Sequence, residues 1–342
     1  MTTLVDSPAS RITLAQLRLS ASNPMAPLGV LVAAVLTLSG CSSVAGSGTT
    51  PTPSPTAVQQ QPVTDHGVRV IPNIEYGDAG GQKLLLDACL PRLAKPSTSD
   101  APDPAPQAAI LTIHGGGWTH GDKAAPQNRD VCVWLAKAGY PTFSVNYRMV
   151  PAFTFPAALE DVQSAVTWLR DPVQVGRFNL DPTRIAAFGG SAGGNLASLL
   201  GTTGTGPLTE GTRVAAVVDL SGPVDLTGAD AKPGFIPTQL AFLGCDTEAD
   251  CPDARAASPI FAASADDSPF FIANSTNELI PIEQARRFAA ALEAARVPTT
   301  FVSVPGGLHS VTMLSPSLRE RILDFYASTL GANSSSPAPG AG

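Results

Sequence analysis

The chain has 342 residues, of which 44% are hydrophobic and only 14% are charged, and its net charge is −7. Soluble domains carry about 25% charged residues, so this composition predicts a large buried core and excludes a wholly disordered chain. The acidic balance and the lack of a basic stretch in the sequence speak against nucleic acid as a partner.

An apolar run near the N-terminus resembles the core of an export signal. Arg11 and Arg18 precede an uncharged apolar stretch over 28–38. Its 11 residues fall short of the roughly 20 that a membrane-spanning helix needs, whereas a signal-peptide core has about this length. A start at Met25 would remove both arginines and weaken this interpretation.

The residues that follow, Leu38-Ser39-Gly40-Cys41, resemble the lipobox of bacterial lipoproteins, in which the cysteine is lipidated and becomes the mature N-terminus. We therefore expect acyl chains on Cys41 to anchor the protein to the outer face of the bacterial cytoplasmic membrane, in the cell envelope. The expected organisation is a signal peptide over 1–40, a lipidated and disordered Pro/Ser/Thr-rich tether over 41–66, a catalytic domain over 67–330 and a disordered tail over 331–342.

Four cysteines remain beyond the lipobox: Cys89, Cys132, Cys245 and Cys251. Disulfides persist in exported proteins, and four cysteines allow three pairings. Proximity in sequence favours Cys89 with Cys132 and Cys245 with Cys251. Since the sequence has no Cys-x-x-Cys or His-x-x-x-His spacing, zinc binding is disfavoured, and no metal or organic cofactor is implied.

From about residue 67 the sequence alternates short β-branched runs with longer helical patterns. This alternation predicts an α/β fold, a doubly wound and mostly parallel eight-stranded sheet with helices on both faces. The strands are predicted over 68–75, 83–90, 108–114, 141–147, 183–189, 214–221, 269–275 and 299–304. The helices are predicted over 127–139, 157–170, 192–200, 281–295 and 315–329. Long irregular connections are expected over 92–107 and 223–268, where such sheets often carry the ligand site.

The strand predicted over 183–189 runs into a G-x-S-x-G motif at 189–193, and a helical pattern starts directly after it. This strand-turn-helix setting is typical of a nucleophile elbow. Because the turn is sharp, side chains two residues before and after the serine would collide, which accounts for Gly189 and Gly193. A phosphate-binding glycine loop is the alternative, but no lysine follows the glycines. Ser191 is therefore the candidate nucleophile.

A second motif, HGGGW over 114–118, lies at the end of the third predicted strand. Backbone N–H groups can approach a developing oxyanion only where no side chain intrudes, and three successive glycines allow that approach. The candidate oxyanion donors are the amides of Gly115 or Gly116 together with the amide of Ala192. We expect His114 to brace this loop.

Ser191 needs a general base, and the sequence offers four histidines. His66 lies in the expected tether, while His114 and His120 flank the glycine loop and lack a third ligand for a metal. In chains with a nucleophile elbow the catalytic residues follow in the order nucleophile, acid, histidine. Only His309 lies downstream of Ser191, so His309 is the predicted base.

Together these motifs resemble the α/β-hydrolase esterases of the HGGG(W) type, grouped with hormone-sensitive-lipase-like enzymes and small carboxylesterases, over essentially all of 67–330. That family usually carries an aspartate four residues before a proline, after its seventh strand. Asn277 stands at this position here, and an asparagine cannot stabilise an imidazolium. The adjacent Glu278, one methylene longer, is the predicted acid, and Asp225 is the alternative.

The resemblance implies a serine hydrolase that cleaves carboxylic esters through an acyl-enzyme, with a small-molecule ester as its substrate. Two alternatives stay open: an amidase or peptidase with the same catalytic residues, and a lipoprotein that only binds, which Asn277 would favour. Tyr147 and Arg148 resemble a common structural element of the family. Trp118 and the stretch over 233–243 are candidates for lining a substrate pocket, although apolar stretches are more often core.

Overall fold

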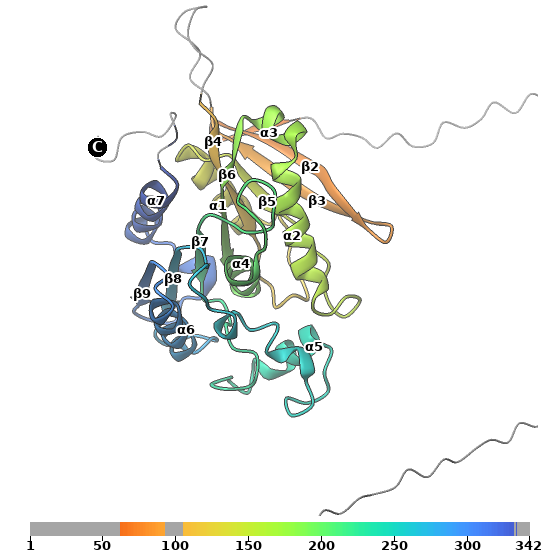
Figure 1. Ribbon diagram of the computed structural model, residues 1–342, viewed down its shortest axis with the longest axis vertical. Helices are drawn as coiled ribbons and strands as arrows, with labels where there is room; N and C mark the ends of the chain where they lie inside the picture. The colour runs from red at the N-terminus through yellow and green to blue at the C-terminus, as the bar shows by residue number, and fades with distance from the viewer. Residues whose placement is uncertain (1–61, 93–104, 332, 334–342) are drawn as a thin grey trace, which may run out of the picture. The chain divides into compact units, whose positions relative to one another are not determined.

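The computed structural model describes residues 62–92, 105–331 and 333 (Figure 1). Within these ranges nine strands form one sheet, in the order β1-β2-β3-β5-β4-β6-β7-β8-β9. The strands are β1 (Val63–Asp65), β2 (Val68–Ala79), β3 (Gln82–Leu90), β4 (Gln107–Ile113), β5 (Thr142–Val145), β6 (Leu180–Gly190), β7 (Val217–Leu220), β8 (Phe270–Ser275) and β9 (Thr299–Val304). The α-helices are α1 (Pro126–Lys137), α2 (Ala157–Arg170), α3 (Pro172–Phe178), α4 (Ala192–Thr203), α5 (Ile236–Leu243), α6 (Ile282–Ala294) and α7 (Pro316–Leu330). The short 3-10 helices are η1 (Pro252–Ala254), η2 (Pro259–Phe261) and η3 (Ser310–Met313).

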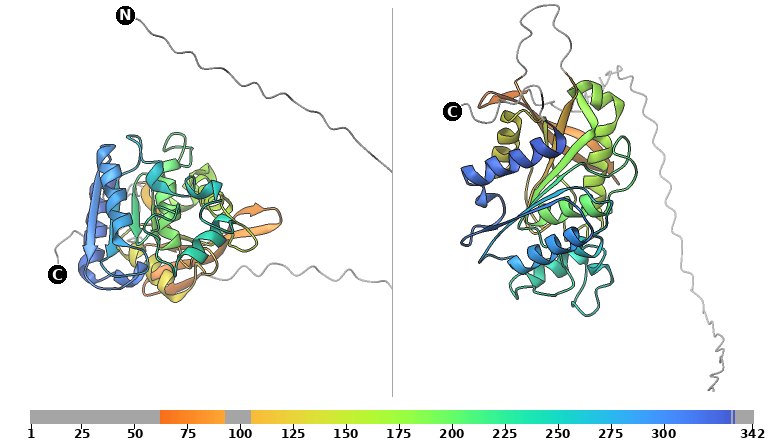
Figure 2. Two further views of the ribbon diagram at one scale, coloured as in Figure 1. Left: turned by 90° about the horizontal axis from the view of Figure 1, so that it is seen from below. Right: turned by 60° about the vertical axis from the view of Figure 1, so that its left-hand side comes forward.

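Strand direction divides the sheet into two parts. β1, β2 and β3 form an antiparallel ribbon that joins the edge of β5. The strands from β5 to β9 along the sheet are all parallel. The β2–β3 ribbon (orange) and the C-terminal elements (blue) lie at opposite ends of the sheet (Figures 1 and 2). Since β5 and β6 lie on either side of β4, the carboxyl ends of β4 and β6 flank the point where the strand order reverses, which is where such sheets bind ligands.

Helices cover both faces of the parallel strands. α1 and α7 pack on one face, where their apolar residues share a core with Ile110 of β4. α2, α4 and α6 pack on the other face, against a core that includes Leu111 of the same strand. Because alternate residues of a strand point to opposite faces, both sets of side chains must be apolar, and this explains the continuous apolar runs in the sequence.

The predicted fold class is confirmed, since the sheet is mostly parallel and carries helices on both faces. All eight predicted strands and all five predicted helices are present, with ends that differ by a few residues. The predicted signal peptide over 1–40, Cys41 and most of the predicted tether lie outside the described residues. Among the residues that are described, no helix is long and apolar enough to cross a bilayer.

One strand, β1, was not predicted, and it corrects the expected boundary at residue 67. Residues 63–65 had been assigned to the disordered tether, but they pair antiparallel with the start of β2. His66 and Gly67 form the turn with φ values of 47° and 84°. A two-residue turn with both φ values positive matches the twist of paired strands, so the His-Gly step was the missed signal.

The predicted disordered tail over 331–342 is also wrong at one position. The Asn333 side chain is buried, and its amide group donates to the carbonyls of Ala108 and Gly139 at 2.9 and 3.0 Å. Its amide oxygen accepts from the Ala108 N–H at 2.8 Å. These bonds satisfy backbone groups at the start of β4 and between α1 and β5, so the domain extends at least to Asn333.

Two helices were missed because they are short. In α3, the Asp171 side chain accepts from the Val173 N–H at 2.8 Å and Pro172 occupies the first turn, so the Asp-Pro step was the available signal. α5 lies inside the connection over 223–268 that the sequence analysis treats as irregular. Both favoured disulfides are present: Cys89–Cys132 links β3 to α1, and Cys245–Cys251 closes a loop after α5.

Candidate active site

Ser191 occupies the turn between β6 and α4. Its backbone has φ 56° and ψ −125°, a strained conformation for a residue with a side chain, and its N–H donates to the Leu220 carbonyl at 2.9 Å. A Cβ added to Gly189 would lie 2.0 Å from the Gly193 carbonyl oxygen, so the turn closes only with glycine there. Ser191 is 8% exposed and stands at the N-terminus of α4, where the helix dipole favours negative charge.

The glycine loop after β4 packs directly on this turn. A Cβ added to Gly115 would lie 2.8 Å from the Gly190 carbonyl oxygen and 3.1 Å from the Ser191 Cβ. Gly116 has φ 121°, and a Cβ there would meet the His120 carbonyl oxygen at 1.9 Å. The sequence therefore needs glycine here for close approach to Ser191 and for the left-handed backbone.

His114 holds the start of this loop, as expected. The ring is buried and stacks on Tyr147 with 4.5 Å between centroids. Its Nδ1–H donates to the Gly115 carbonyl at 2.8 Å, and the Tyr147 hydroxyl donates to the His114 carbonyl at 2.9 Å. Burial lowers the pKa of His114, so the ring is neutral and acts as a brace for the backbone.

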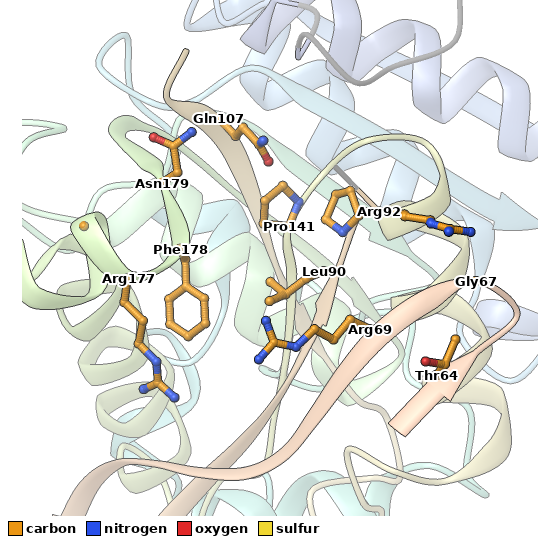
Figure 3. A pocket seen from close by; sticks show the side chains of 12 residues that line it. Thr64, Gly67, Arg69, Leu90, Arg92, Gln107, Pro141, Arg177, Phe178 and Asn179 are labelled. Atoms are coloured by element: carbon orange, nitrogen blue, oxygen red, sulfur yellow. The ribbon is translucent and has the colours of Figure 1, made fainter. Parts of the chain in front are cut away.

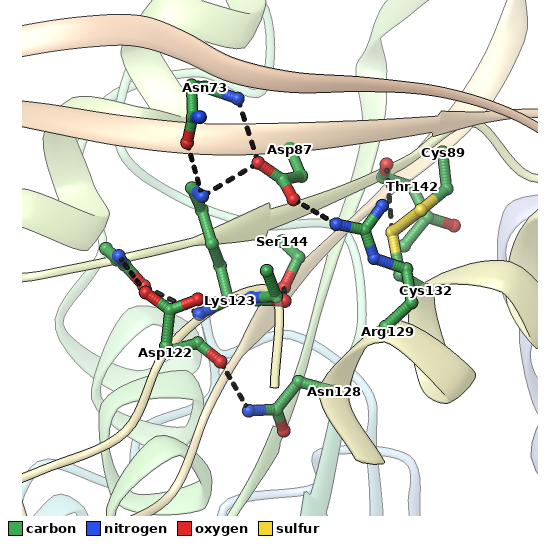
Figure 4. A network of polar contacts seen from close by, with 12 residues as sticks. Asn73, Asp87, Cys89, Asp122, Lys123, Asn128, Arg129, Cys132, Thr142 and Ser144 are labelled. Carbon is green, nitrogen blue, oxygen red and sulfur yellow. Dashed lines mark hydrogen bonds and ion pairs between the residues drawn. A yellow bond between two sulfur atoms is a disulfide. The ribbon is translucent and has the colours of Figure 1, made fainter. Parts of the chain in front are cut away.

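A buried ionic network fixes the far end of the same loop (Figure 4). The Lys123 ammonium lies 2.8 Å from one carboxylate oxygen of Asp87, and Arg129 pairs with the other oxygen. Asn146 accepts from the Lys123 backbone N–H at 2.7 Å. The network lies beside the Cys89–Cys132 disulfide and joins the loop to β3, to α1 and to the residue after β5.

His309 and Glu278 extend from the ends of two neighbouring strands, β9 and β8. The Nδ1–H of His309 donates to a carboxylate oxygen of Glu278. The Glu278 side chain is fully buried, while the His309 side chain is 31% exposed. The carboxylate can thus orient the imidazole and stabilise its protonated form.

The other candidate acids lie elsewhere. Asn277 is exposed, and its backbone N–H donates to the Gly306 carbonyl at 2.9 Å. Asp225 is buried, but its carboxylate accepts from Arg287 at 2.9 Å and from the Thr227 hydroxyl at 2.6 Å. Of the three side chains, the structure therefore brings only the Glu278 carboxylate to His309.

A second buried carboxyl lies behind Glu278. Asp219, at the end of β7, accepts from the Ser198 hydroxyl at 2.8 Å and from the Gly222 N–H at 2.7 Å. Burial, together with a smaller contribution from the charge of Glu278, raises the pKa of Asp219 to about 6, against these two hydrogen bonds. No sequence motif marks Asp219, since a lone aspartate in an apolar run carries no chemical signal.

A cavity of about 580 Å³ unites the groups with candidate roles. Its lining includes Ser191, His309, Gly115 and Gly116, and it contains neither a carboxylate nor a lysine or arginine. The remaining lining residues are Gly117, Thr119, His120, Gly121, Gln127, Asn128, Phe235, Thr238, Leu279, Ser310, Val311 and Thr312. Among the described residues, no cluster of three or more His, Cys, Asp or Glu side chains could hold a metal ion.

The candidate pocket residues fall into two groups. Phe235 and Thr238, from the stretch over 233–243, line the cavity. Trp118 is fully buried instead and stacks on Phe242 with 4.0 Å between ring centroids. The Trp118 side chain therefore supports α5 from behind and does not line the cavity, which corrects one expectation from the sequence.

A family model with the description BD-FAE matches residues 96–292, more than half of the chain. The chain belongs to the BD-FAE family. Two curated relatives from Mycobacterium tuberculosis (strain ATCC 25618 / H37Rv) are 30% identical to this BD-FAE chain. The match to "Esterase LipQ" covers 78% of the chain and 65% of LipQ, and the match to "Probable carboxylic ester hydrolase LipM" covers 79% and 62%. The BD-FAE chain thus spans slightly less than two thirds of the length of either relative.

Solved structures share the fold of this BD-FAE chain. A truncated carbohydrate esterase from gut microbiota superposes with a TM-score of 0.65 at 24% identity, over 76% of this chain and 95% of that one. The thermophilic esterase Est2 from Thermogutta terrifontis superposes with a TM-score of 0.61 at 22% identity, over 78% and 94%. These likenesses identify the α/β-hydrolase fold that the sequence predicts.

Proposed function

We propose that the protein is a serine hydrolase that cleaves carboxylic esters through an acyl-enzyme. The observation that carries this proposal is that Ser191, at a strained elbow, shares one cavity with the glycine loop and with His309, whose ring is hydrogen-bonded to Glu278. The esterases named among the relatives and structural neighbours support the same class of reaction.

In the acylation step, Nε2 of His309 accepts the Ser191 hydroxyl proton as the oxygen attacks the ester carbonyl carbon. The Glu278 carboxylate stabilises the positive charge of the resulting imidazolium through its hydrogen bond with the Nδ1–H. The imidazolium then returns the proton to the departing alkoxide, and the alcohol leaves. A water molecule repeats the sequence on the acyl-enzyme and releases the carboxylic acid.

The negative charge of the tetrahedral intermediate develops on the former carbonyl oxygen and needs hydrogen-bond donors that point at this oxygen. The backbone amides of Gly115 or Gly116 and of Ala192 fit this role, since the glycine loop packs on the elbow and Ala192 opens α4. Each such donor contributes about 10²–10³ in rate. The helix dipole of α4 favours the same charge.

The lining of the cavity supports an uncharged ester with a polar alcohol part. Hydroxyl and amide side chains of Thr119, Gln127, Asn128 and Thr312 line the cavity, and no Asp, Glu, Lys or Arg side chain lines it. The neighbour described as a carbohydrate esterase is consistent with such an alcohol. Comparing acetyl esters of a sugar and of a simple alkanol tests this point.

A protein that only binds is the weaker alternative, because a buried carboxylate contacts His309 even though Asn277 replaces the usual aspartate. An amidase or peptidase would use the same residues. The rates of hydrolysis of matched ester and amide substrates distinguish it from an esterase. We expect the ratio of the ester rate to the amide rate to be much larger for the enzyme than for the uncatalysed reactions.

We also propose that acyl chains on Cys41 anchor the protein to the outer face of the cytoplasmic membrane. The apolar run over 28–38 and the lipobox-like residues that follow it support this proposal. Replacing Cys41 with Ala should move the protein from the membrane fraction to the soluble fraction. Membrane retention in that variant would contradict lipidation at this cysteine.

The experiment that tests the proposed activity replaces Ser191 with Ala and measures hydrolysis of a short-chain nitrophenyl ester. We expect kcat to fall by about 10⁴-fold or more, because the acyl-enzyme cannot form. A thermal unfolding curve verifies that the variant is folded. Residual hydrolysis near the parent rate in the folded variant would refute the proposal.

A further inference from the structure

A second cavity, of about 620 Å³, lies at the opposite edge of the sheet from Ser191 (Figure 3). Gln107, the first residue of β4, and Asn179, directly before β6, line it, whereas Ser191 follows the carboxyl end of β6. The two cavities share no lining residue. The volume falls in the range of small-molecule sites, and the proposed ester hydrolysis makes no use of this cavity.

Three arginines from separate parts of the chain surround the cavity. Arg69 comes from β2, Arg92 follows β3, and Arg177 lies in the last turn of α3 (Figure 3). All three arginines are exposed. Within the described residues none of them forms an ion pair, and no carboxylate lines the cavity. Three arginines that gather around one cavity without an ion pair in the described part of the protein stand out in a chain whose net charge is −7.

The inner surface of the cavity is apolar. Leu90, Pro141 and Phe178 line it, and Phe178 is 7% exposed because its ring packs against Phe143 at 5.1 Å between centroids. The guanidinium of Arg177 lies 4.7 Å from the centre of the Phe178 ring, which holds the cation at the border of the apolar surface. An apolar wall bordered by guanidinium groups matches a ligand that joins an anionic group to an apolar part.

We propose that this cavity binds the phosphate group of an amphiphilic ligand, with an anionic phospholipid as its source. Guanidinium groups bind phosphate oxygens through paired, charge-assisted hydrogen bonds, and those of Arg69 and Arg177 border the apolar wall, whereas Arg92 points away from them (Figure 3). The glycerol and first acyl carbons then lie on Leu90 and Phe178. A soluble organic phosphate carries the same chemistry and is the other possible source.

Chain continuity favours the lipid. Thr64 lines the cavity, so the segment that contains Cys41 joins the domain within a few residues of the three arginines. An acyl anchor at Cys41, as proposed above, keeps a bilayer within reach of the tether. The arginine cavity then gives the domain a second contact with the membrane, which sets its orientation and directs the active-site cavity away from the lipid.

Vesicle co-sedimentation tests this proposal on the full chain carrying Cys41→Ala, so that acylation plays no part. The vesicles contain phosphatidylcholine alone or with phosphatidylglycerol. The test variant adds Arg69→Gln, Arg92→Gln and Arg177→Gln. A matched control adds three glutamines at exposed arginines outside the cavity, Arg286→Gln, Arg296→Gln and Arg321→Gln, and so has the same net charge.

We expect the parent and the control to bind the phosphatidylglycerol vesicles, and the cavity variant to bind them about tenfold or more weakly. Equal losses in both triple variants, or no binding by the parent to either vesicles or sn-glycerol 3-phosphate in calorimetry, would overturn the proposal. Binding of glycerol phosphate but not vesicles, lost only in the cavity variant, assigns the site to a soluble phosphate. Nitrophenyl ester hydrolysis should be unchanged in both triple variants, so failure here is distinct from failure of the proposed esterase function.

Discussion

Glu278 accepts a hydrogen bond from the Nδ1–H of His309, across the ends of two neighbouring parallel strands. β8 and β9 pair in register up to Ser275 and Val304, so the loops that follow them begin side by side. The Glu278 side chain is completely buried. A carboxylate held in this way keeps the imidazole that it contacts in one orientation.

Glu278→Gln should therefore lower kcat for ester hydrolysis by about 10²–10⁴-fold, because a neutral amide cannot stabilise the imidazolium. Asp225→Asn is the matched control: its carboxylate contacts Arg287, so the change should leave kcat nearly unchanged and lower the melting temperature. Steady-state kinetics on both variants measures the difference. A larger loss of kcat in the Asp225 variant would assign the acid role to Asp225.

Gly116→Ala should reduce kcat more than it raises KM. The added methyl group would lie 1.9 Å from the His120 carbonyl oxygen, at a backbone φ of 121°, so the loop must shift and misalign its amides. Loss of one oxyanion donor costs about 10²–10³ in rate. Gly176→Ala is a useful control, because no atom lies within 4 Å of its added Cβ. Equal kinetics in the two variants would show that the glycine loop does not act on the oxyanion.

Lys123→Met should destabilise the fold by about 3 kcal/mol, since it leaves the buried Asp87 carboxylate with one cation fewer. The exposed pair of Arg286 with Glu283 provides the comparison, and Arg286→Gln should cost less than about 1 kcal/mol. Urea unfolding of both variants gives the two free energies. If the two substitutions prove equally mild, the Lys123 network does not hold the loop.

The raised pKa of Asp219 predicts that the free energy of unfolding depends on pH. Its pKa is about 6 in the folded protein and 3.8 in the unfolded chain, so its ionisation destabilises the fold as pH rises through this interval. The penalty is nearly complete at about pH 7. Asp219→Asn removes it, and the stability of the variant relative to the parent should therefore rise by about 2 kcal/mol between pH 4 and pH 7. A relative stability that stays constant over this range would contradict the raised pKa.

Local patterns were enough to predict most of the fold and to single out Ser191 as the candidate nucleophile. The G-x-S-x-G and HGGGW motifs each lie within one turn of chain, so their chemistry is visible without contacts. The acid was harder, because Glu278 and Asp225 differ only in where the fold carries them. Both are buried, and the contact with His309 distinguishes them; that contact arises from the pairing of β8 with β9.

Features built from distant segments could not be predicted in this way. The arginines of the second cavity lie at positions 69, 92 and 177, so the sequence shows no basic stretch although the fold gathers them. The bonds of Asn333 to Ala108 join residues 225 positions apart. The β1 hairpin could have been predicted, since its His-Gly turn is a local signal. The surrounding composition, typical of a tether, made this signal hard to recognise.

Covalent labelling with a fluorophosphonate, followed by mass spectrometry of the peptides, tests most directly whether Ser191 is the nucleophile. We expect one modified residue, Ser191, and we expect His309→Asn to slow labelling strongly while the variant remains folded, because the imidazole activates the hydroxyl. Native protein that stays unlabelled, or a label on any other residue, would contradict it.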